Sequence, residues 1–475
     1  MASFRPARLV KVHCTFPKNA ADSVLAALQQ AGIAHVTEPD DAGLEPAAAS
    51  ERPRLDGLIV KASHLLSLAG EGRHSRLLDR MFGARTLEVK MSGHAIGQVL
   101  ASAEQELGRL EQQLASGKAA RQSVRHRLLQ VREELGNIDA RLTALEQCRS
   151  TDYFYRMAFW VEQSKLAKAE NIILSAAGKR ATIEAEDAQD DAPTLLGHGR
   201  WLKPFELLTS LYGLPKYNDI DPTLITAISF PLLFGLMFPD AGYGLILTMV
   251  SLFAYLHTTK NDGTQRSLNV VLLYCGLASI ASGLAFGEFF GGLVQIHALA
   301  FEPANNIMLL MYMSVTIGIV HMSIGLLSKL IDSVAKKRFP ARQIGWLVII
   351  WPLLLYGFSG SGFYLYATVP GLLLLLASQR SEFIEDFMSI ISNVFSYLRI
   401  GIIAVTHIFI ARLLADFLLG IPLTPVGIAL GVLVFTLAAL GNFVLSVFIV
   451  FIQSLRLHWL EFFSKLQLDR GQPFR

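Results

Sequence analysis

One arginine stands inside a long apolar stretch of this sequence. Arg399 is preceded by FSYL and followed by IGIIAVTHIFIA, in an apolar segment that begins at residue 383. At a helical rise of about 1.5 Å per residue it lies about 24 Å from the start of that segment, near the middle of a bilayer. A cation at this depth costs at least about 2.5 to 3.5 kcal/mol, and arginine does not lose its proton to avoid that cost. The position indicates a functional charge, with an internal salt bridge or snorkelling as the structural alternatives.

Three more polar residues accompany Arg399 in the last two apolar segments. His407 follows it by eight residues, about 80° around the same helix, and is either a buried neutral histidine or a group that moves protons. Gln453 and Arg456 are three residues apart and share one helix face; Arg456 is alternatively a cation at the cytoplasmic interface. Arg412, near the outer end, is typical of an interfacial anchor. Arg399, His407, Gln453 and Arg456 are therefore the candidates for ion translocation.

Other polar side chains in the apolar half could line a path for ions to Arg399. Some lie within the predicted membrane segments, and three acidic residues cluster at one cytoplasmic mouth. For six of them, helix capping or an interfacial position is at least as good an explanation, namely Asp240, Glu288, His321, Glu382, Glu385 and Asp386. The candidate lining residues are Ser396, Asn442, Ser446, Ser454, Glu288, His321, Asp240, Glu382, Glu385, Asp386 and Glu461.

Eight apolar segments must position these side chains. Four of them are shorter than the roughly 20 apolar residues that span a bilayer core. The last two, of 36 and 32 residues, would extend about 54 and 48 Å as helices. They must tilt strongly or protrude, unless they include cytoplasmic helix. The predicted segments are 224–238, 243–256, 268–287, 307–328, 343–358, 363–378, 383–418 and 425–456.

The loops between these segments differ in charge. Loops 257–267, 329–342 and 379–382 contain eight Lys/Arg, whereas the alternate loops contain none. Because basic loops stay in the cytoplasm, both termini are predicted to be cytoplasmic. That orientation requires an even number of spans, which eight satisfies.

The two halves of the chain differ in composition. Of 475 residues, 52% are hydrophobic and 17% are charged, against about 25% charged residues in a soluble domain. Residues 1–222 hold 28 Lys/Arg and 28 Asp/Glu, whereas residues 223–475 hold 14 and 11. The first half is typical of a cytoplasmic domain, and it begins without the apolar core of a secretory signal. Neither half has the concentrated basic charge of a nucleic-acid-binding surface.

Signatures of catalysis, metals and cofactors were not found. Cys14, Cys148 and Cys275 are isolated and lack the paired spacing of a zinc or iron-sulfur site. Gly117-Lys118 lacks the upstream glycine and the following Ser/Thr of a phosphate-binding loop. G-x-S-x-G and H-E-x-x-H do not occur. We therefore expect no cofactor, no metal, no nucleotide site and no enzymatic activity of this chain by itself.

Alternation and helical periodicity predict a small α/β lobe in the first half. Leucines and β-branched residues that step by three and four between residues 96 and 148 predict a helical hairpin or a bent coiled-coil arm. Residues 40–53 are expected to be a loop and 187–200 a linker. Strands are expected at 8–16, near His35, at 153–161 and at 181–186, with helices at 20–31, capped by Asn19, and at 165–177.

The predicted fold is therefore mixed and has three parts. A cytoplasmic α/β lobe with its coiled-coil arm occupies residues 1–200, and an amphipathic linker occupies 201–222. An all-α membrane domain of eight helices, the last two long and tilted, occupies 223–475 and carries the candidates for ion translocation.

Three separated stretches resemble one family of membrane proteins. They are FELLTSLYGLPKYNDIDPTLITAISFPLLFGLMFPDAGYG (205–244), SYLRIGIIAVTH (396–407) and QSLRLHWLEFFSK (453–465). In this order they resemble the membrane stator subunit of V-type and archaeal-type rotary ATPases, called subunit a or subunit I. The resemblance is strong over residues 200–475. The N-terminal lobe is similar only in kind and looks shorter than the two α/β lobes and long coiled coil of that family.

The resemblance implies a role for each translocation candidate. Arg399 matches the family's essential arginine on helix seven, and Arg456 matches the second arginine on helix eight. Gln453 resembles the glutamine that accompanies the second arginine, and His407 resembles a histidine of eukaryotic members. Ser446 stands where eukaryotic members carry an acidic residue, which implies a different outer half-channel.

The resemblance also implies a mechanism and partners. A ring of small rotor subunits would carry membrane carboxylates past Arg399, which favours their charged form. Each carboxylate would release its H⁺ or Na⁺ into one half-channel and load from the other. The N-terminal lobe would bind peripheral stalk subunits, and the complex would lie in the lipid bilayer of a prokaryotic plasma membrane.

Two other functions stay open on the residues alone. One is a secondary transporter that uses Arg399 for an anionic substrate, although no internal repeat of the kind found in transporters is visible. The other is a membrane-anchored coiled-coil scaffold, which gives no reason for an arginine at mid-membrane depth.

Overall fold

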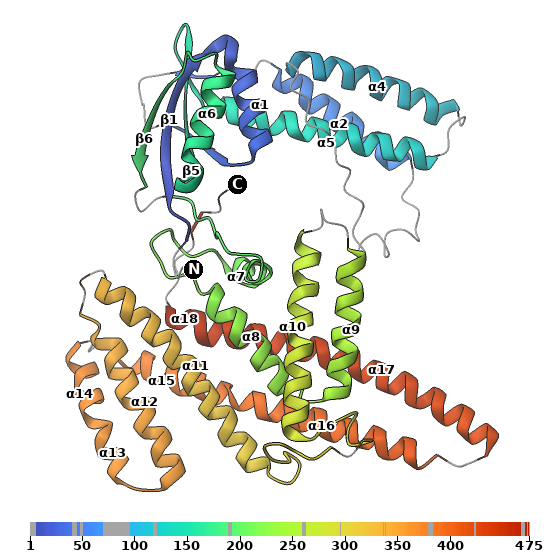
Figure 1. Ribbon diagram of the computed structural model, residues 1–475, viewed down its shortest axis with the longest axis vertical. Coiled ribbons are helices and arrows are strands. Elements are labelled where there is room, and N and C mark those ends of the chain that lie inside the picture. Colours follow the sequence, from blue (N-terminus) through green and yellow to red (C-terminus); the bar gives the residue numbers. More distant parts are fainter. Residues whose placement is uncertain are drawn as a thin grey trace. The chain divides into compact units, whose positions relative to one another are not determined.

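The chain forms two compact units (Figure 1). The α/β unit comprises Ala7–Leu195 with Gln472–Arg475, and the helical unit comprises Met1–Pro6 with Leu196–Gly471. The computed structural model describes residues 6–39, 45–47, 51–69, 96–116, 121–188, 192–258, 263–294, 296–335, 337, 339–378, 383–421, 424–466, 471–472 and 474.

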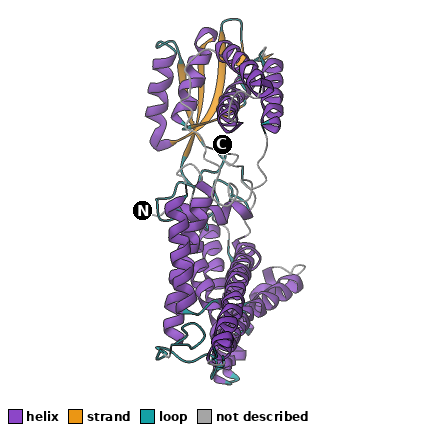
Figure 2. Cartoon of the chain, turned by 90° about the vertical axis from the view of Figure 1, so that its right-hand side faces the viewer, coloured by secondary structure: helices purple, strands orange, loops and turns teal. Residues whose placement is uncertain are grey.

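An antiparallel sheet forms the centre of the α/β unit (Figure 2). β1 (Leu9–Pro17) pairs with β5 (Phe154–Glu162) on one side and with β6 (Thr182–Asp187) on the other. β2 (Ala34–Thr37) pairs with the far edge of β5, where β4 (Arg149–Ser150) also pairs and is joined by β3 (Glu45–Pro46). The strands predicted at 8–16, near His35, at 153–161 and at 181–186 are confirmed.

Two helices pack with the buried side chains of this sheet, α1 (Ala21–Ala31) and α6 (Leu166–Ala176). The alternation of β1 sends Val12 and Phe16 into this core. The predicted helix 20–31 is confirmed, but the capping role of Asn19 is wrong. The chain leaves β1 through a 3₁₀ turn over Lys18–Ala20, so Ala20 occupies the cap position and no side chain caps the helix.

Three further helices among the described residues of the α/β unit form a bundle. α4 (Ile96–Ser116) and α5 (Arg121–Glu146) correspond to the predicted hairpin, and their leucine stripes are buried against each other. α2 (Arg52–Leu68) packs against both as a third helix. The loop predicted over 40–53 is interrupted by β3, and α2 begins at its end. The coiled-coil arm itself stays a prediction.

A buried histidine ties together the segment that leads into the helical unit. His198 Nδ1 lies 2.9 Å from Glu206 Oε1, and its Nε2 lies 3.3 Å from Asp221 Oδ2. The hydrogen bond to Glu206 raises the pKa of His198 despite its burial, and the charge of Asp221 adds to the effect. Asp221 also accepts from the backbone N–H of Thr223 at the start of the first apolar helix. These contacts span η3 (Lys203–Phe205) and α7 (Glu206–Tyr212).

The helical unit consists of apolar helices, each at or near a predicted segment. Among the described residues, five are long and apolar enough to cross a membrane, over Gly263–Phe286, Ile307–Val334, Ala341–Ser359, Ile391–Leu419 and Pro425–Phe462. Three shorter apolar helices cover Thr223–Met237, Ala241–His257 and Phe363–Ala377. The count of eight spans stays a prediction. By element, the helices are α8 (Thr223–Met237), α9 (Ala241–His257), α10 (Gly263–Phe286), α11 (Ile307–Ala335), α12 (Ala341–Ser359), α13 (Phe363–Ala367) and α14 (Val369–Ser378).

Of the last two predicted segments, 383–418 is divided into two helices, whereas 425–456 is confirmed as one α-helix. Segment 383–418 is divided at Tyr397 into α15 (Phe383–Ser396) and α16 (Leu398–Leu419). Segment 425–456 is α17 (Pro425–Arg456), which continues through a π-helical turn over Leu457–Phe462 into α18 (Phe463–Leu466). Both irregularities lie next to a candidate arginine, because Tyr397 precedes Arg399 by two residues and the π-helical turn follows Arg456 directly.

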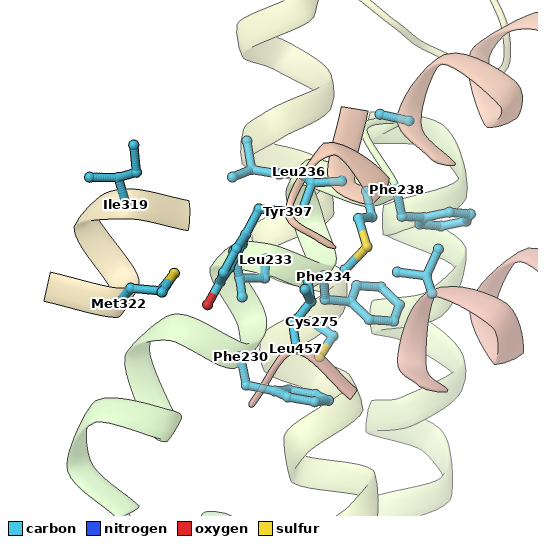
Figure 3. Close-up of a cluster of buried hydrophobic side chains, with 14 of the residues drawn as sticks. Phe230, Leu233, Phe234, Leu236, Phe238, Cys275, Ile319, Met322, Tyr397 and Leu457 are labelled. Carbon is cyan, nitrogen blue, oxygen red and sulfur yellow. The ribbon is translucent and has the colours of Figure 1, made fainter. Parts of the chain in front are cut away.

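Tyr397 keeps right-handed helical dihedral angles, φ −73° and ψ −17°, so the irregularity at this residue is local. Its ring is fully buried against α11, where Gly318 faces it. A methyl group on Gly318 would overlap the ring, so only glycine lets α11 accept the tyrosine. Figure 3 shows Tyr397 within the apolar cluster that joins α8, α10, α11 and the end of α17, near Leu233 and Leu236.

Candidate functional site

Arg399 lies at the start of α16 and is half-buried. Its Nη1 atom is buried and has no hydrogen-bond partner, and no carboxylate lies within salt-bridge distance of it, among the described residues. Arg456 and Glu461 are its charged neighbours. The guanidinium is therefore not closed off by a direct pair with the described part of its own chain, as the internal salt-bridge alternative would require.

Glu461 approaches this arginine from the π-helical turn. Its side chain is buried, and Oε1 accepts a hydrogen bond from Ser396 Oγ. Its Oε2 is buried without a partner among the described residues. Ser396 is the last residue of α15, so the contact joins the helix break to the π-helical turn. π-helical turns are frequent at functional sites, and this one brings a carboxylate close to Arg399 and Arg456.

Two buried histidines, His321 and His458, belong to the same polar region as Glu461. His321 Nδ1 lies 2.9 Å from the hydroxyl of Tyr397, and its ring lies 5.0 Å from that of His458. His458 Nδ1 donates to the carbonyl of Ser454 at 2.8 Å, and its Nε2 lies 2.7 Å from Ser229 Oγ. We call Ser396, Glu461, Tyr397, His321, His458 and Ser229 the π-turn cluster.

Asp240 anchors a second polar region at the junction of α8 and α9. Its Oδ1 accepts from the backbone N–H groups of Gly242 and Tyr243, which caps α9. The same carboxylate accepts from the N–H groups of Phe290 and Gly291 in the loop after α10. Asp240 is buried, and these four donors give it a structural role in holding the loop.

That loop carries Glu288 to α16. Gly291 adopts φ +63° and lies against the backbone of Ala411, where a Cβ atom would overlap. Glu288 is 1% exposed and its Oε1 accepts from Arg412 Nη2 at 2.6 Å. Glu288 Oε2 is buried without a partner among the described residues. Arg412 is thus not simply the interfacial anchor expected, because the glycine loop brings a buried carboxylate to it.

His407 lies between the two helices that meet at Asp240. It is buried, and neither ring nitrogen has a hydrogen-bond partner among the described residues. Its ring lies 4.4 Å from that of Phe238 and 5.8 Å from that of Tyr243, and Asp240 is its charged neighbour. We call Asp240, Glu288, Arg412 and His407 the loop cluster.

The remaining candidates lie on α17 or are not described. Ser446 Oγ donates to Asn442 Oδ1 at 3.3 Å. Gln453 Oε1 and Ser454 Oγ are buried without partners among the described residues, while Arg456 is exposed. Glu382 lies outside the described residues, and Glu385 and Asp386 belong to α15 without described side chains.

Sequence reasoning missed three members of these clusters. Tyr397, His458 and Ser229 were not candidates, although all three lie inside the motifs that carry the resemblance. For Tyr397 and His458, proximity to Arg399 and Arg456 in those motifs was the available signal. The local sequence could not predict the pairing of Arg412 with Glu288, because the two residues are 124 positions apart.

This sequence matches the profile of a known protein family. The profile of the V-type ATPase 116kDa subunit family matches residues 76–310. The chain is similar to this family over those residues, just under half of its length. The five long apolar helices among the described residues agree with that similarity and indicate an integral membrane protein.

Three relatives of this chain carry the same name. The A-type ATP synthase subunit I of Methanocaldococcus jannaschii is 27% identical over 441 residues, covering 79% of this chain and 63% of the relative. That of Pyrococcus horikoshii is 26% identical over 401 residues, covering 77% and 60%. That of Aeropyrum pernix is 38% identical over 131 residues, covering 28% and 17%. The chain thus spans about three-fifths of the length of the first two.

Proposed function

We propose that this chain is the stationary membrane subunit of a rotary ATP synthase or ATPase. It conducts H⁺ or Na⁺ through two half-channels that meet at Arg399, and it holds no nucleotide site. The observation that carries the proposal is the arginine itself: a half-buried guanidinium whose Nη1 has no partner among the described residues, in an apolar helix. The names of the relatives support the assignment to such a complex.

The two polar clusters support two half-channels. In the orientation predicted from the basic loops, the π-turn cluster lies on the cytoplasmic side of Arg399 and the loop cluster on the outer side. Each contains a buried carboxylate with one oxygen that has no partner among the described residues, Glu461 in the first and Glu288 in the second. Buried polar atoms without a protein partner favour water, so both clusters suit a path for ions.

Arg399 separates the two paths in this mechanism. A fixed cation stabilises the ionised form of any carboxylate that faces it, so a rotor carboxylate gives up its ion before it passes. The same charge repels a cation that would leak directly between the half-channels. Gln453 and Arg456, on the neighbouring α17, would orient the passing carboxylate by hydrogen bonding.

The surface of α17 supports contact with a rotor. In the most apolar 18-residue stretch of Pro425–Phe462 no residue is buried, although α17 packs along α16 (Figure 1). An apolar face of this length suits a ring of small membrane subunits, with lipid covering the rest. We further propose eight spans with both termini cytoplasmic, and peripheral stalk subunits bound by the α/β unit.

Replacement of Arg399 tests the proposal. In the assembled complex, Arg399→Ala and Arg399→Gln should abolish ATP-driven ion transport, measured in reconstituted vesicles, while subunit composition stays normal. Arg342→Gln, which removes a cation from a predicted cytoplasmic loop, is the matched control and should leave transport unchanged. ATP-driven transport at the normal rate in Arg399→Ala would refute the proposed function.

A further inference from the structure

A cavity outside both polar clusters lies beside the predicted cytoplasmic ends of α9 and α10. It has a volume of about 930 Å³ and lies entirely within the helical unit. Residues of the connecting segment 198–204 form one wall, and the last turns of α9 and the first turns of α10 form the other. We call it the basic pocket.

Three cations line the basic pocket: Arg200, Lys203 and Arg266. None of its described lining residues is acidic, and none of the three cations forms a salt bridge with a described residue. Arg266 is held in place, because its guanidinium stacks on the ring of Tyr255 at 4.7 Å and its Nη2 donates to the Tyr255 hydroxyl at 2.9 Å. Planar guanidinium groups are suited to the oxygens of a phosphate group.

The other lining residues are aromatic or aliphatic. Trp201 is 77% exposed, and Tyr255 and Tyr274 lie beside it in the lining. Tryptophan and tyrosine are enriched where a membrane meets water. Leu252 belongs both to the pocket and to an exposed apolar face of α9 that also carries Leu245, Met249, Phe253 and Leu256. The pocket therefore opens onto a surface that lipid would cover.

We propose that the basic pocket binds the phosphate headgroup of an anionic phospholipid, whose acyl chain lies along the exposed face of α9. Three cations that form no salt bridge with a described residue favour a net negative headgroup over a zwitterionic one, and the carboxylates of Glu206 and Asp221 are paired with His198 instead. A soluble phosphate compound would make no use of the adjoining apolar face. The inference rests on the proposed placement of α9 and α10 in the membrane, but not on the role of Arg399.

The test uses the full-length chain, purified in detergent and stripped of native lipid. Dioleoylphosphatidylglycerol and dioleoylphosphatidylcholine are the probes, and native mass spectrometry counts the bound lipid. The anionic lipid should bind saturably and more tightly. Arg200→Gln with Lys203→Gln should lower its affinity about tenfold or more. Both side chains are exposed, so this variant should keep the melting temperature of the unaltered chain.

The matched control removes two cations on the same side of the predicted membrane, with Lys337→Gln and Arg342→Gln. It should leave binding of the anionic lipid unchanged. An equal loss of affinity in both variants would mean that general surface charge attracts the lipid, and it would overturn the proposal. Competition by glycerol 3-phosphate at the same concentration as the lipid would overturn it too, because the ligand would then be a soluble phosphate.

Fluorescence locates the bound lipid. Brominated phosphatidylglycerol should quench Trp201, so the quenching in the unaltered chain should exceed that in Trp201→Phe. Equal quenching of the two proteins would place the lipid elsewhere and contradict the proposal. None of these measurements needs the rotor, so their failure is distinguishable from a failure of the Arg399 test.

Discussion

Arg412 donates a hydrogen bond to Glu288 across 2.6 Å, and this pair joins the glycine-rich loop after α10 to α16. The loop is also held by Asp240, through the N–H groups of Phe290 and Gly291. The helix that carries Arg399 is therefore positioned in part by a loop from a distant segment of the chain. The stability of this arrangement can be measured separately from ion transport.

Glu288→Gln should destabilise the helical unit. Loss of the negative charge leaves Arg412 without its counter-ion, and since the Arg412 side chain is 37% exposed, the expected cost is about 1 to 3 kcal/mol. Thermal unfolding of Glu288→Gln, Arg412→Gln and the double variant in detergent measures it. Strictly additive effects of the two single substitutions would show that the pair contributes no coupling energy.

Gly318→Ala should disrupt the packing of Tyr397 on α11. The added methyl group would overlap the tyrosine ring, and overpacking of this kind costs about 1 to 3 kcal/mol. Gly441→Ala on α17 is the control, because a methyl group there meets no atom within 4 Å. Melting temperatures of the two variants make the comparison, and equal values would contradict the close approach of Tyr397.

The cluster around His198 predicts a pH dependence outside the membrane. The hydrogen bond to Glu206 raises the pKa of His198 in the folded chain above its unfolded value of about 6.5. The stabilisation is therefore complete below about pH 6.5 and is lost as the pH rises through the raised pKa. Hydrogen exchange of residues 196–223 should become faster over that range.

The variant His198→Gln tests whether His198 causes this pH dependence. Exchange is expressed as protection factors, because the intrinsic exchange of every amide rises with pH. The fall in the protection factors of residues 196–223 with pH should be lost in His198→Gln, whereas His126→Gln, at an exposed histidine of α5, should keep it. A pH profile that persists in His198→Gln would assign the effect to another group.

Cys14 and Cys148 should not react in the folded α/β unit. Both are fully buried, and burial raises the pKa of each thiol to about 12. Because the thiolate is the reactive form, neither should be labelled by maleimide at pH 7.5 until the chain unfolds. Mass spectrometry of the labelled peptides measures this, and rapid stoichiometric labelling of either cysteine under native conditions would be inconsistent with the core.

Local patterns predicted most of the individual elements. The alternation in 8–16 identified β1, and the steps of three and four between 96 and 148 identified α4 and α5. Helix α2 was missed, and its apolar face became visible only where it packs against the other two helices. A periodic pattern indicates which face of an element is buried, but not the element that covers it.

The charged residues of the candidate site could be proposed from the sequence, but the contacts that they make could not. Arg399 and Glu461 were candidates from their position in apolar sequence, and the structure places them as charged neighbours. The burial of the Tyr397 ring against α11 was not predicted, because it depends on the space that Gly318 leaves on another helix. The pairing of Glu288 likewise depends on positive φ angles at glycines 287, 291 and 292, which no hydrophobic pattern encodes.

The exposed apolar side chains of α17 affect how a partner could move along this helix. Its outward side chains between residues 430 and 448 include Leu430, Leu433, Leu437, Leu440, Val444 and Phe448. Attraction between such hydrocarbon surfaces has no preferred direction, so a partner can shift along them without first breaking a directional bond. In the proposed complex, this apolar surface would therefore offer a rotor little resistance to movement past α17.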